Sequence, residues 1–435
     1  MNRKILRRIL AAETSVLLLL AAAALILSYR EGAVPVETEP PATQPPETQM
    51  PTQAPTQAPV QTQPVTQPAT EPSTEPQPTV YTLTFAGDCT LGTLYQLYSA
   101  SSCFPAVAGE DDTYPFANVQ TWFASDDLTL VNLEGPLTEG GTPEDKRFVF
   151  RGSPDFARML PAGSVEWVSL ANNHTYDFGQ SGYDSTRKAL DGVGVAYAGD
   201  AESSLLTTER GLKVGIFALA FSVDREEMAD AIAELRQQGA EIVIVSCHWG
   251  TEGSYHFDYS QEDLAHAAID AGADIVYGHH PHVLQPIETY NGGIIYYSLG
   301  NFCFGGNSDP RDYDTALISQ QVIREVDGTV HLGTYTAVPC SISSVDYPNN
   351  YQPTPAPEDS ERYTRVLEKL SGSFTGPDLV TNYDDETEPA TEPETTEPET
   401  TGQEPTEPQP SETAPEATDP PAPTSPPLPE TPAEG

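Results

Sequence analysis

Basic residues are scarce in this sequence. Lysine and arginine number 20 against 64 aspartates and glutamates, which gives a formal net charge of -44 at pH 7. A chain this acidic repels nucleic acid and anionic membrane surfaces, and it contains no basic stripe with interleaved aromatic residues that would overcome the repulsion. We therefore exclude nucleic acid as a partner. No lysine or arginine follows Lys369, so part of the acidity belongs to the C-terminal tail.

Cysteines are also few. The 5 cysteines are an odd number without any C-x-x-C spacing, which excludes a fully paired disulfide framework and a zinc knuckle. Cys89, Cys247 and Cys303 fall within motifs described below, where a thiol could ligate metal, but we favour small buried residues on core strands. A bridge between Cys103 and Cys340 outside the cell is the disulfide that we consider.

Two stretches lack the apolar residues of a core. Residues 34–79 consist mainly of Pro, Thr, Gln, Glu, Ala and Val, and residues 384–435 of Pro, Thr and Glu. Neither can bury enough surface to offset the entropy of ordering its backbone, so we expect a stalk and a disordered acidic tail. A polyproline-like stalk at roughly 3 Å per residue would reach on the order of 100 Å from its anchor. Between them we expect one folded domain, 80–347, and a short extension, 348–383.

The N-terminus joins four basic residues to an apolar run. Residues 9–29, interrupted by Glu13, Thr14 and Ser15, are long enough to span a bilayer, and the basic residues favour a cytoplasmic N-terminus. The strictly apolar part, 16–27, has the length of a signal peptide, which is the alternative. Because no clear small-residue cleavage site follows Ser28, we expect residues 1–33 to form a cytoplasmic stub and an uncleaved transmembrane anchor. The folded domain would then be extracytoplasmic.

Short apolar runs alternate with helical patterns in the middle of the chain. The expected strands are residues 81–86, 128–133, 167–170, 213–220, 241–247, 274–277 and 294–298. One helix is expected over 226–238, and a second runs from about Ser260 to Gly272. Asn291-Gly292 is a signal for a hairpin turn between two apolar stretches. This alternation indicates a layered α/β domain.

Potential metal ligands follow the expected strands, at the edge where α/β folds build their sites. In chain order they are Asp88, Asn132, Glu134, Asn172, Asn173, His174, Asp177, His248, His279, His280 and His282. Each could be an ordinary turn or loop residue if taken singly. Carboxylate, asparagine and histidine side chains at successive strand ends are, however, what a two-metal hydrolytic site requires. The sequence therefore predicts a metal site.

Six motifs, in this order, resemble the signature set of the CapA family of poly-γ-glutamate capsule-synthesis proteins. They are Phe85-Ala-Gly-Asp-Cys-Thr-Leu-Gly92, Asn132-Leu-Glu-Gly-Pro-Leu-Thr138, Leu170-Ala-Asn-Asn-His-Thr-Tyr-Asp-Phe-Gly179, His248-Trp-Gly-Thr-Glu252, Gly278-His-His-Pro-His-Val-Leu-Gln285 and Tyr297-Ser-Leu-Gly-Asn-Phe302. That family is similar in fold to calcineurin-like metallophosphoesterases. The resemblance implies a four-layer α/β/β/α sandwich of the metallo-dependent phosphatase type.

The resemblance also implies roles for single residues. The metal ligands would be Asp88, Glu134, Asn173, His248, His280 and His282. His174 would hydrogen-bond the substrate or protonate its leaving group, and Asp177 would orient His174. The cofactor would be one or two divalent ions of Mn, Fe or Zn.

The sequence departs from the phosphoesterase pattern in two places. Asp88 is followed by Cys89 and Thr90, so the histidine of the Asp-x-His motif is missing. The second acidic ligand is a glutamate, Glu134, where an aspartate is usual. These departures favour a single or an altered metal over a complete dinuclear centre.

Two further residues are candidates for the substrate site. Arg151, in a small basic cluster, could hold an anionic substrate or equally serve as a surface ion-pair partner. Asn301 could line the cleft, although turn formation is the alternative.

The expected function is that of a membrane-anchored, extracytoplasmic CapA-like protein of capsule or poly-γ-glutamate synthesis or export. It would act as a metal-dependent hydrolase or transferase on an anionic envelope polymer or a phosphoester. Its partners would be a polymer such as poly-γ-glutamate, the membrane and capsule synthase subunits. The alternative is a non-catalytic, polymer-binding assembly factor of a capsule synthase complex, which the missing histidine favours.

Overall fold

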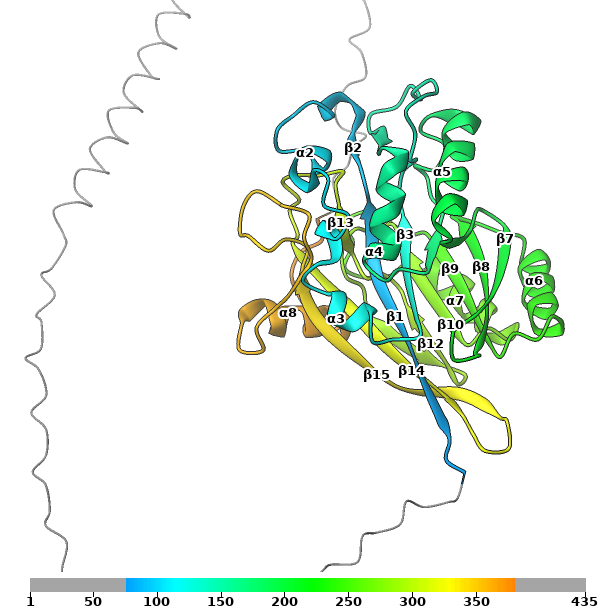
Figure 1. Cartoon of the computed structure of the whole chain (residues 1–435). Coiled ribbons are helices and arrows are strands. Elements are labelled where there is room, and N and C mark those ends of the chain that lie inside the picture. Colours follow the sequence, from blue (N-terminus) through cyan, green and yellow to red (C-terminus); the bar gives the residue numbers. More distant parts are fainter. Residues whose placement is uncertain (1–75, 380–435) are drawn as a thin grey trace, which may run out of the picture. The chain divides into compact units, whose positions relative to one another are not determined.

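The computed structural model describes residues 76–379 (Figure 1). All the strands expected from the sequence form, within a few residues of the expected bounds: β1 (Thr79–Thr90), β3 (Leu128–Leu133), β5 (Trp167–Ser169), β8 (Lys213–Ala220), β9 (Ile242–His248), β10 (Ile275–His279) and β12 (Gly293–Tyr296). The largest difference is at β1, which continues past residue 86 and through Asp88.

The first sheet combines strands from the beginning of the described region with strands from its end. Its order is β16-β15-β14-β1-β3-β5-β6, and β13 pairs with β1 beyond this path. The additional members are β6 (Ala196–Ala198), β13 (Asn301–Phe304), β14 (Asp314–Arg324), β15 (Val330–Ser341) and β16 (Thr354–Pro355). Strands β1, β3, β5 and β6 run parallel, so their carboxyl ends meet at one edge.

The second sheet has the order β11-β12-β10-β9-β8-β7, with β7 (Glu202–Thr207) and β11 (Ile287–Tyr290) antiparallel at its two edges. Its four central strands run parallel to one another. The hairpin turn between β11 and β12 is confirmed, because Tyr290 pairs with Gly293 while Asn291 and Gly292 have φ values of 45° and 87°. A separate two-stranded sheet pairs β2 (Thr93–Leu94) with β4 (Phe150–Arg151).

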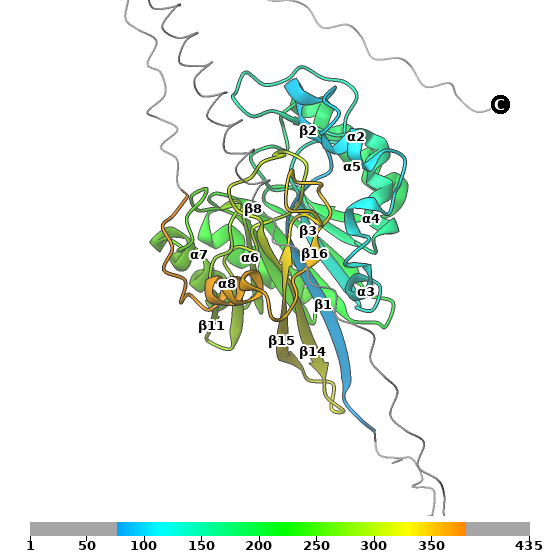
Figure 2. The same ribbon diagram turned by 90° about the vertical axis from the view of Figure 1, so that its left-hand side faces the viewer.

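Alternation along the strands determines how the sheets pack. In β9, Ile242 and Ile244 belong to a core cluster that includes residues of both sheets, whereas Val243 and Val245 belong to a cluster with α6 (Arg225–Gln237) and α7 (Tyr259–Asp270). The outer face of the first sheet packs instead on the small helices and on α5 (Gly179–Val193). Figure 2 shows α3 (Gln120–Phe123), α4 (Met159–Ala162) and α5 on one side of the molecule and α6 and α7 on the other. The mixed α/β architecture is thus confirmed.

Helices follow local signals with some shifts. The remaining helices are α2 (Phe104–Ala108), α3 (Gln120–Phe123), α4 (Met159–Ala162), α5 (Gly179–Val193) and α8 (Glu361–Leu370), with short 3-10 turns at Tyr95–Leu97, Tyr114–Phe116 and Pro154–Arg158. The second expected helix, α7, begins earlier than predicted, because Asp258 is its N-cap and Gln261 completes the capping box. Helix α8 lies within the expected extension and contributes Val366 and Leu370 to the core between the sheets.

Several expectations concern residues that the structure does not describe. The anchor at 1–33, most of the stalk and the tail from 384 lie outside the described residues. Within residues 76–379, no helix is long and apolar enough to cross a membrane. The bridge that we considered between Cys103 and Cys340 is wrong, because all the cysteines are free and buried.

Candidate metal centre

Asp88 lies at an irregularity of β1. The pairing of β1 with β3 shifts register just before Asp88, and bulges of this kind re-aim side chains next to functional sites. Gly87 permits the close approach of the chain, because a Cβ atom there would lie 2.1 Å from the Gly300 carbonyl oxygen. The Asp88 amide donates to that same oxygen at 2.8 Å. Asp88 is thereby buried in register with Asn132 of β3 and Asn301 of β13.

Amide side chains hold the two buried carboxylates in place. Asn132 Nδ2 donates to Asp88 Oδ1 at 2.9 Å and to Glu134 Oε2 at 3.3 Å. Asn172 Nδ2 donates in turn to Asn132 Oδ1 at 3.1 Å and to the Leu133 carbonyl at 3.0 Å. The sequence singled out both asparagines as potential ligands, but the structure gives them a supporting role behind the carboxylates.

Two histidines reach the carboxylates from the second sheet. Strand β10 ends at His279, and in the loop that follows His280 has a φ of 95° and His282 a φ of 56°. Positive φ is uncommon outside glycine and clusters at functional sites. The loop crosses the strand ends, so that His280 N donates to Asp88 Oδ2 at 3.4 Å and the His282 ring lies beside both carboxylates.

His282 lies at the centre of this cluster. Its Nδ1 is 3.2 Å from Asp88 Oδ2 and 3.0 Å from Asn301 Oδ1, and its Nε2 is 3.6 Å from Glu134 Oε1. Burial alone would lower the pKa of His282, but the Glu134 and Asp88 carboxylates raise it to about 10. Burial would likewise raise the pKa of Asp88, but the His279 and His282 rings beside it hold this pKa well below its usual range. The carboxylate pair therefore attracts positive charge.

His248, the last residue of β9, forms a second group with Asn173 and His280. Its Nε2 lies 2.9 Å from Asn173 Oδ1, and the centres of the His248 and His280 rings are 4.7 Å apart. Burial lowers the pKa of both histidines, for His280 to about 3. Both imidazoles are therefore neutral at physiological pH, which is the form that ligates a metal.

Two sets of side chains have the geometry of a metal site. The ligand atoms of Asp88, Glu134 and His282 lie within 4.8 Å of one another, and so do those of Glu252, His280 and His282. Within the described residues, Glu134 Oε1 and His280 Nδ1 are buried without a hydrogen-bond partner, which is costly unless a ligand satisfies them. Oxygen and imidazole ligands suit a divalent cation such as Mn, Fe or Zn. The donor set therefore fits one or two such ions.

The structure brings most of the predicted ligands together. Asp88, Glu134, His280 and His282 all belong to these two sets. Asn173 and His248 are joined by a hydrogen bond, and the His248 ring lies beside the His280 ring. Glu252 was not predicted as a ligand; the signal that could have identified it is its place at the end of the motif that begins with His248.

The structure also shows which side chains lie where the histidine of the Asp-x-His pattern would be. Thr90 occupies the position of the histidine in the Asp-x-His pattern, and its hydroxyl is buried without a hydrogen-bond partner among the described residues. His279 Nδ1 lies 3.3 Å from Asp88 Oδ1. A histidine from β10 thus stands beside Asp88 although the one expected on β1 is absent.

His174 and Asp177 form a buried pair beside the carboxylates. His174 Nδ1 lies 2.8 Å from Asp177 Oδ2, and the other Asp177 oxygen lies 2.5 Å from Lys146 Nζ. His174 Nε2 is left 4.0 Å from Glu134 Oε1. Burial lowers the pKa of His174, although the Asp177 carboxylate opposes this effect. The resemblance implied a pairing of this kind, with Asp177 orienting His174.

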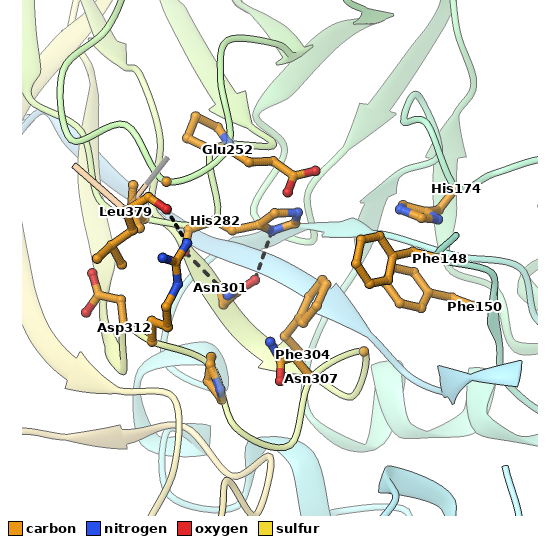
Figure 3. A pocket seen from close by; sticks show the side chains of 16 residues that line it. Phe148, Phe150, His174, Glu252, His282, Asn301, Phe304, Asn307, Asp312 and Leu379 are labelled. Carbon is orange, nitrogen blue, oxygen red and sulfur yellow. Dashed lines mark hydrogen bonds between the residues drawn. The ribbon is translucent and has the colours of Figure 1, made fainter. Parts of the chain in front are cut away.

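A cavity of about 160 Å³ opens beside these groups. His174, Glu252, His282 and Asn301 line it together with aromatic side chains that include Phe150. Figure 3 shows His174 on one side of His282 and Glu252 above the His282 ring. Candidate ligands and a candidate acid or base therefore face the same space.

The structure does not bring Arg151 to this cavity. Its guanidinium lies over the rings of Tyr98, Tyr95 and Phe178, at 4.5, 5.1 and 5.8 Å from their centres. The arginine that lines the cavity is Arg311, in the loop before β14. No sequence signal singled it out.

Solved structures offer only distant matches. NAD nucleotidase of Haemophilus influenzae matches with a TM-score of 0.36 and 13% identity, covering 68% of this chain and 63% of that one. A purple acid phosphatase from yellow lupin matches with a TM-score of 0.31 and 10% identity, covering 60% and 54%. Matches this distant carry no argument about function.

Sequence comparisons are more specific. The PGA biosynthesis protein CapA of Bacillus subtilis is 29% identical over 319 residues, covering 67% of this chain and 78% of the relative. The capsule biosynthesis protein CapA of Bacillus anthracis is 30% identical over 289 residues, covering 59% and 67%. The family model described as bacterial capsule synthesis protein PGA_cap matches residues 82–306, which contain all six motifs and more than half of the chain. The resemblance is thus confirmed, and the chain belongs to the bacterial capsule synthesis protein (PGA_cap) family.

Proposed function

We propose that this protein acts in the synthesis or export of an anionic envelope polymer such as poly-γ-glutamate, as a metal-dependent hydrolase or transferase on the polymer or on a phosphoester. The names of the two CapA relatives support the capsule context. The observation that carries the catalytic part is the position of His282, which belongs to both candidate ligand sets and lines the same cavity as His174.

We further propose that the fold is a four-layer sandwich of the metallo-dependent phosphatase type. The core cluster shared by both sheets and the helices on each outer face support this assignment. The gathering of ligand side chains at the strand ends supports it as well.

The chain's own residues suggest how the site works. Asp88, Glu134, Glu252, His280 and His282 would hold the metal. A bound divalent ion supplies Lewis acidity toward a substrate oxygen and lowers the pKa of a bound water.

Proton transfer would be the role of His174, which is paired with the buried Asp177. With Nδ1 held by Asp177, the His174 ring presents Nε2 to the cavity, where it can exchange a proton with the substrate. Lys146 Nζ, which lies 2.5 Å from Asp177 Oδ1, helps to hold this carboxylate in place and so fixes the orientation of the ring. Phe148, Phe150 and Phe304 line the same cavity and limit the access of water.

Elemental analysis of the purified full chain tests this proposal. We expect one or two equivalents of tightly held Mn, Fe or Zn, lost in a His280→Ala, His282→Ala double variant. His331→Ala is the matched control, because His331 is exposed and pairs with Glu325 away from the cavity. If the wild-type protein holds no metal after incubation with all three ions, the hydrolase proposal fails.

The alternative is a non-catalytic assembly factor that binds the polymer during synthesis and export. The threonine at position 90 favours it, because one ligand of the phosphoesterase pattern is replaced. A screen of metal-loaded protein against phosphoesters and γ-glutamyl oligomers separates the two proposals. Polymer binding without any turnover would favour the assembly factor.

We also propose that residues 1–33 anchor the protein in the cell membrane and that the stalk carries the folded domain outward. The apolar run and the basic residues before it support this topology. Deletion of residues 1–33 should move the protein from the membrane fraction to the soluble fraction. External protease should degrade the folded domain of the full chain in intact wall-free cells, and protection of the domain would contradict the topology.

A further inference from the structure

Arg311 carries a charge that no carboxylate of the described residues neutralises. It lines the cavity as the only lysine or arginine among the lining residues. Its one hydrogen bond within residues 76–379 is from Nη2 to the Leu379 carbonyl oxygen. A guanidinium has five N–H donors, so most of its donors are left for a ligand.

Asp312, the acidic residue next to Arg311 in the sequence, already pairs with other groups. Asp312 Oδ2 lies 2.7 Å from Lys369 Nζ and accepts a hydrogen bond from the Tyr255 hydroxyl at 2.9 Å. Asp314 is likewise paired with Lys369, at 2.8 Å. Two carboxylates line the cavity, and neither forms an ion pair with Arg311: Asp312 pairs with Lys369, and Glu252 belongs to a candidate metal-ligand set.

The residues that line the cavity lie on two sides of His282. Figure 3 shows Leu379 and Asp312 on one side of His282, and His174 with Phe148 and Phe150 on the other. The hydrogen bond to Leu379 places the Arg311 guanidinium on the side away from His174. A ligand held by Arg311 would therefore extend across His282 toward His174.

We propose that Arg311 forms an oxyanion subsite that binds a carboxylate or phosphate group of the substrate next to the group positioned at His282. Guanidinium binds both kinds of oxyanion with paired, charge-assisted hydrogen bonds. The subsite deepens the proposed function, on which it rests, because it selects for substrates with a second anionic group. It also takes the role that the sequence gave to Arg151.

Binding measurements on the full chain test the subsite. The probes are a short γ-linked glutamate oligomer, the same oligomer with its α-carboxylates converted to amides, and inorganic phosphate. We expect Arg311→Gln to weaken binding of the anionic oligomer by about tenfold, the loss of one charge-assisted contact, and to leave the amidated oligomer unaffected. Arg311→Lys should recover part of the loss, because the charge returns without the fork.

Two control variants exclude indirect effects. Lys188→Gln removes the same charge from an exposed position on α5, so any loss it shares would reflect net charge. Asp346→Asn changes an exposed carboxylate that does not line the cavity, while Arg311 and its hydrogen bond to Leu379 stay intact. A loss as large in either control as in Arg311→Gln would overturn the proposal.

The remaining outcomes are separable from the fate of the proposed function. Weaker binding of phosphate alone in Arg311→Gln supports the subsite and identifies a phosphoester as its ligand, whereas weaker binding of the oligomer identifies a carboxylate polymer. Unchanged binding of both anions by a metal-loaded Arg311→Gln variant overturns the subsite and leaves the metal centre standing. A metal-free protein whose anion binding still depends on Arg311 removes the hydrolase proposal and retains the subsite.

Discussion

His174 Nδ1 lies 2.8 Å from Asp177 Oδ2, and this contact is one of three that a single buried carboxylate makes. Asp177 Oδ2 also accepts a hydrogen bond from the Phe150 amide at 2.5 Å, and Oδ1 pairs with Lys146 at 2.5 Å. The carboxylate thus joins the loop before β4 to the Asn-His motif. Its loss should affect both stability and chemistry.

Replacing Asp177 with asparagine tests this relationship. Asp177→Asn keeps the size of the side chain but removes its ion pair with Lys146, so we expect the free energy of unfolding to fall by about 2–4 kcal/mol. Any hydrolytic rate should fall by about 10- to 100-fold, because the His174 ring loses its orientation. Urea denaturation and initial rates on a chromogenic phosphodiester measure the two effects. Asp184→Asn, on the exposed face of α5, is the control, and wild-type values in Asp177→Asn would contradict the role of the pair.

Metal binding should appear as added stability. A ligand that binds only the folded state stabilises it by about 2.7 kcal/mol when its free concentration is about 100 times its Kd. We expect the melting temperature of chelator-treated protein to rise when Mn, Fe or Zn is added. His282→Ala should abolish most of this rise, because His282 belongs to both ligand sets. His331→Ala should retain it, and an equal rise in His282→Ala would place the metal elsewhere.

The central strands could be predicted because they are apolar on both faces. In β9, from Ile242 to His248, every residue is buried, and the expected strand differs from the observed one by a single residue at each end. By contrast β15 was not predicted, because most of it, from Val330 onward, is partly exposed and mixes polar with apolar residues. Strand β15 forms because it pairs with β14, and such pairing depends on the tertiary fold and not on the local sequence.

In the candidate site, too, some features could be predicted from the sequence and others could not. Asp88 and His282 could be predicted as site residues because each comes near the carboxyl end of an expected central strand, where α/β folds build their sites. Their two strands belong to different sheets, so the packing of the sheets brings the side chains together. The contrast between Arg151 and Arg311 could not be predicted. Arg151 is held among aromatic rings, whereas Arg311 lines the cavity from the loop before β14 and donates a hydrogen bond to the Leu379 carbonyl, far along the sequence.

Helix α8 is held to the sheet by a buried charge cluster that yields its own prediction. Lys369 is 3% exposed and bridges Asp312 and Asp314. Lys369→Ala leaves the buried Asp312 carboxylate without its cation, whereas Asp314 keeps its ion pairs with Arg362 and Arg365. We therefore expect a loss of about 2–3 kcal/mol in the free energy of unfolding. Lys188→Ala, at an exposed position, should stay within about 0.5 kcal/mol of wild type. Equal stability of the two variants in urea would show that α8 does not depend on this cluster.

Asp126, which precedes β3, should make stability depend on pH far from the metal centre. Burial raises the pKa of this carboxyl to about 7, even though Thr129 Oγ1 donates a hydrogen bond to it at 2.7 Å. The unfolded pKa is about 3.9, so the folded state binds the proton more tightly. Above pH 7 both states are ionised, and the folded state bears the cost of a partly buried charge. As the pH falls from 7 to 4, the folded state takes up a proton and this cost disappears.

The Asp126→Asn variant isolates that cost, because asparagine can still accept the hydrogen bond from Thr129 but does not titrate. Relative to wild type, we expect the variant to be more stable by about 1–3 kcal/mol at pH 8 and nearly equal at pH 4. Asp346→Asn, in an exposed loop, removes one charge without this dependence on burial. Urea denaturation at several pH values measures the difference between variant and wild type. A difference that stays constant from pH 4 to pH 8 would show that Asp126 is ionised throughout, because only a group that titrates in this range can make the difference grow with pH.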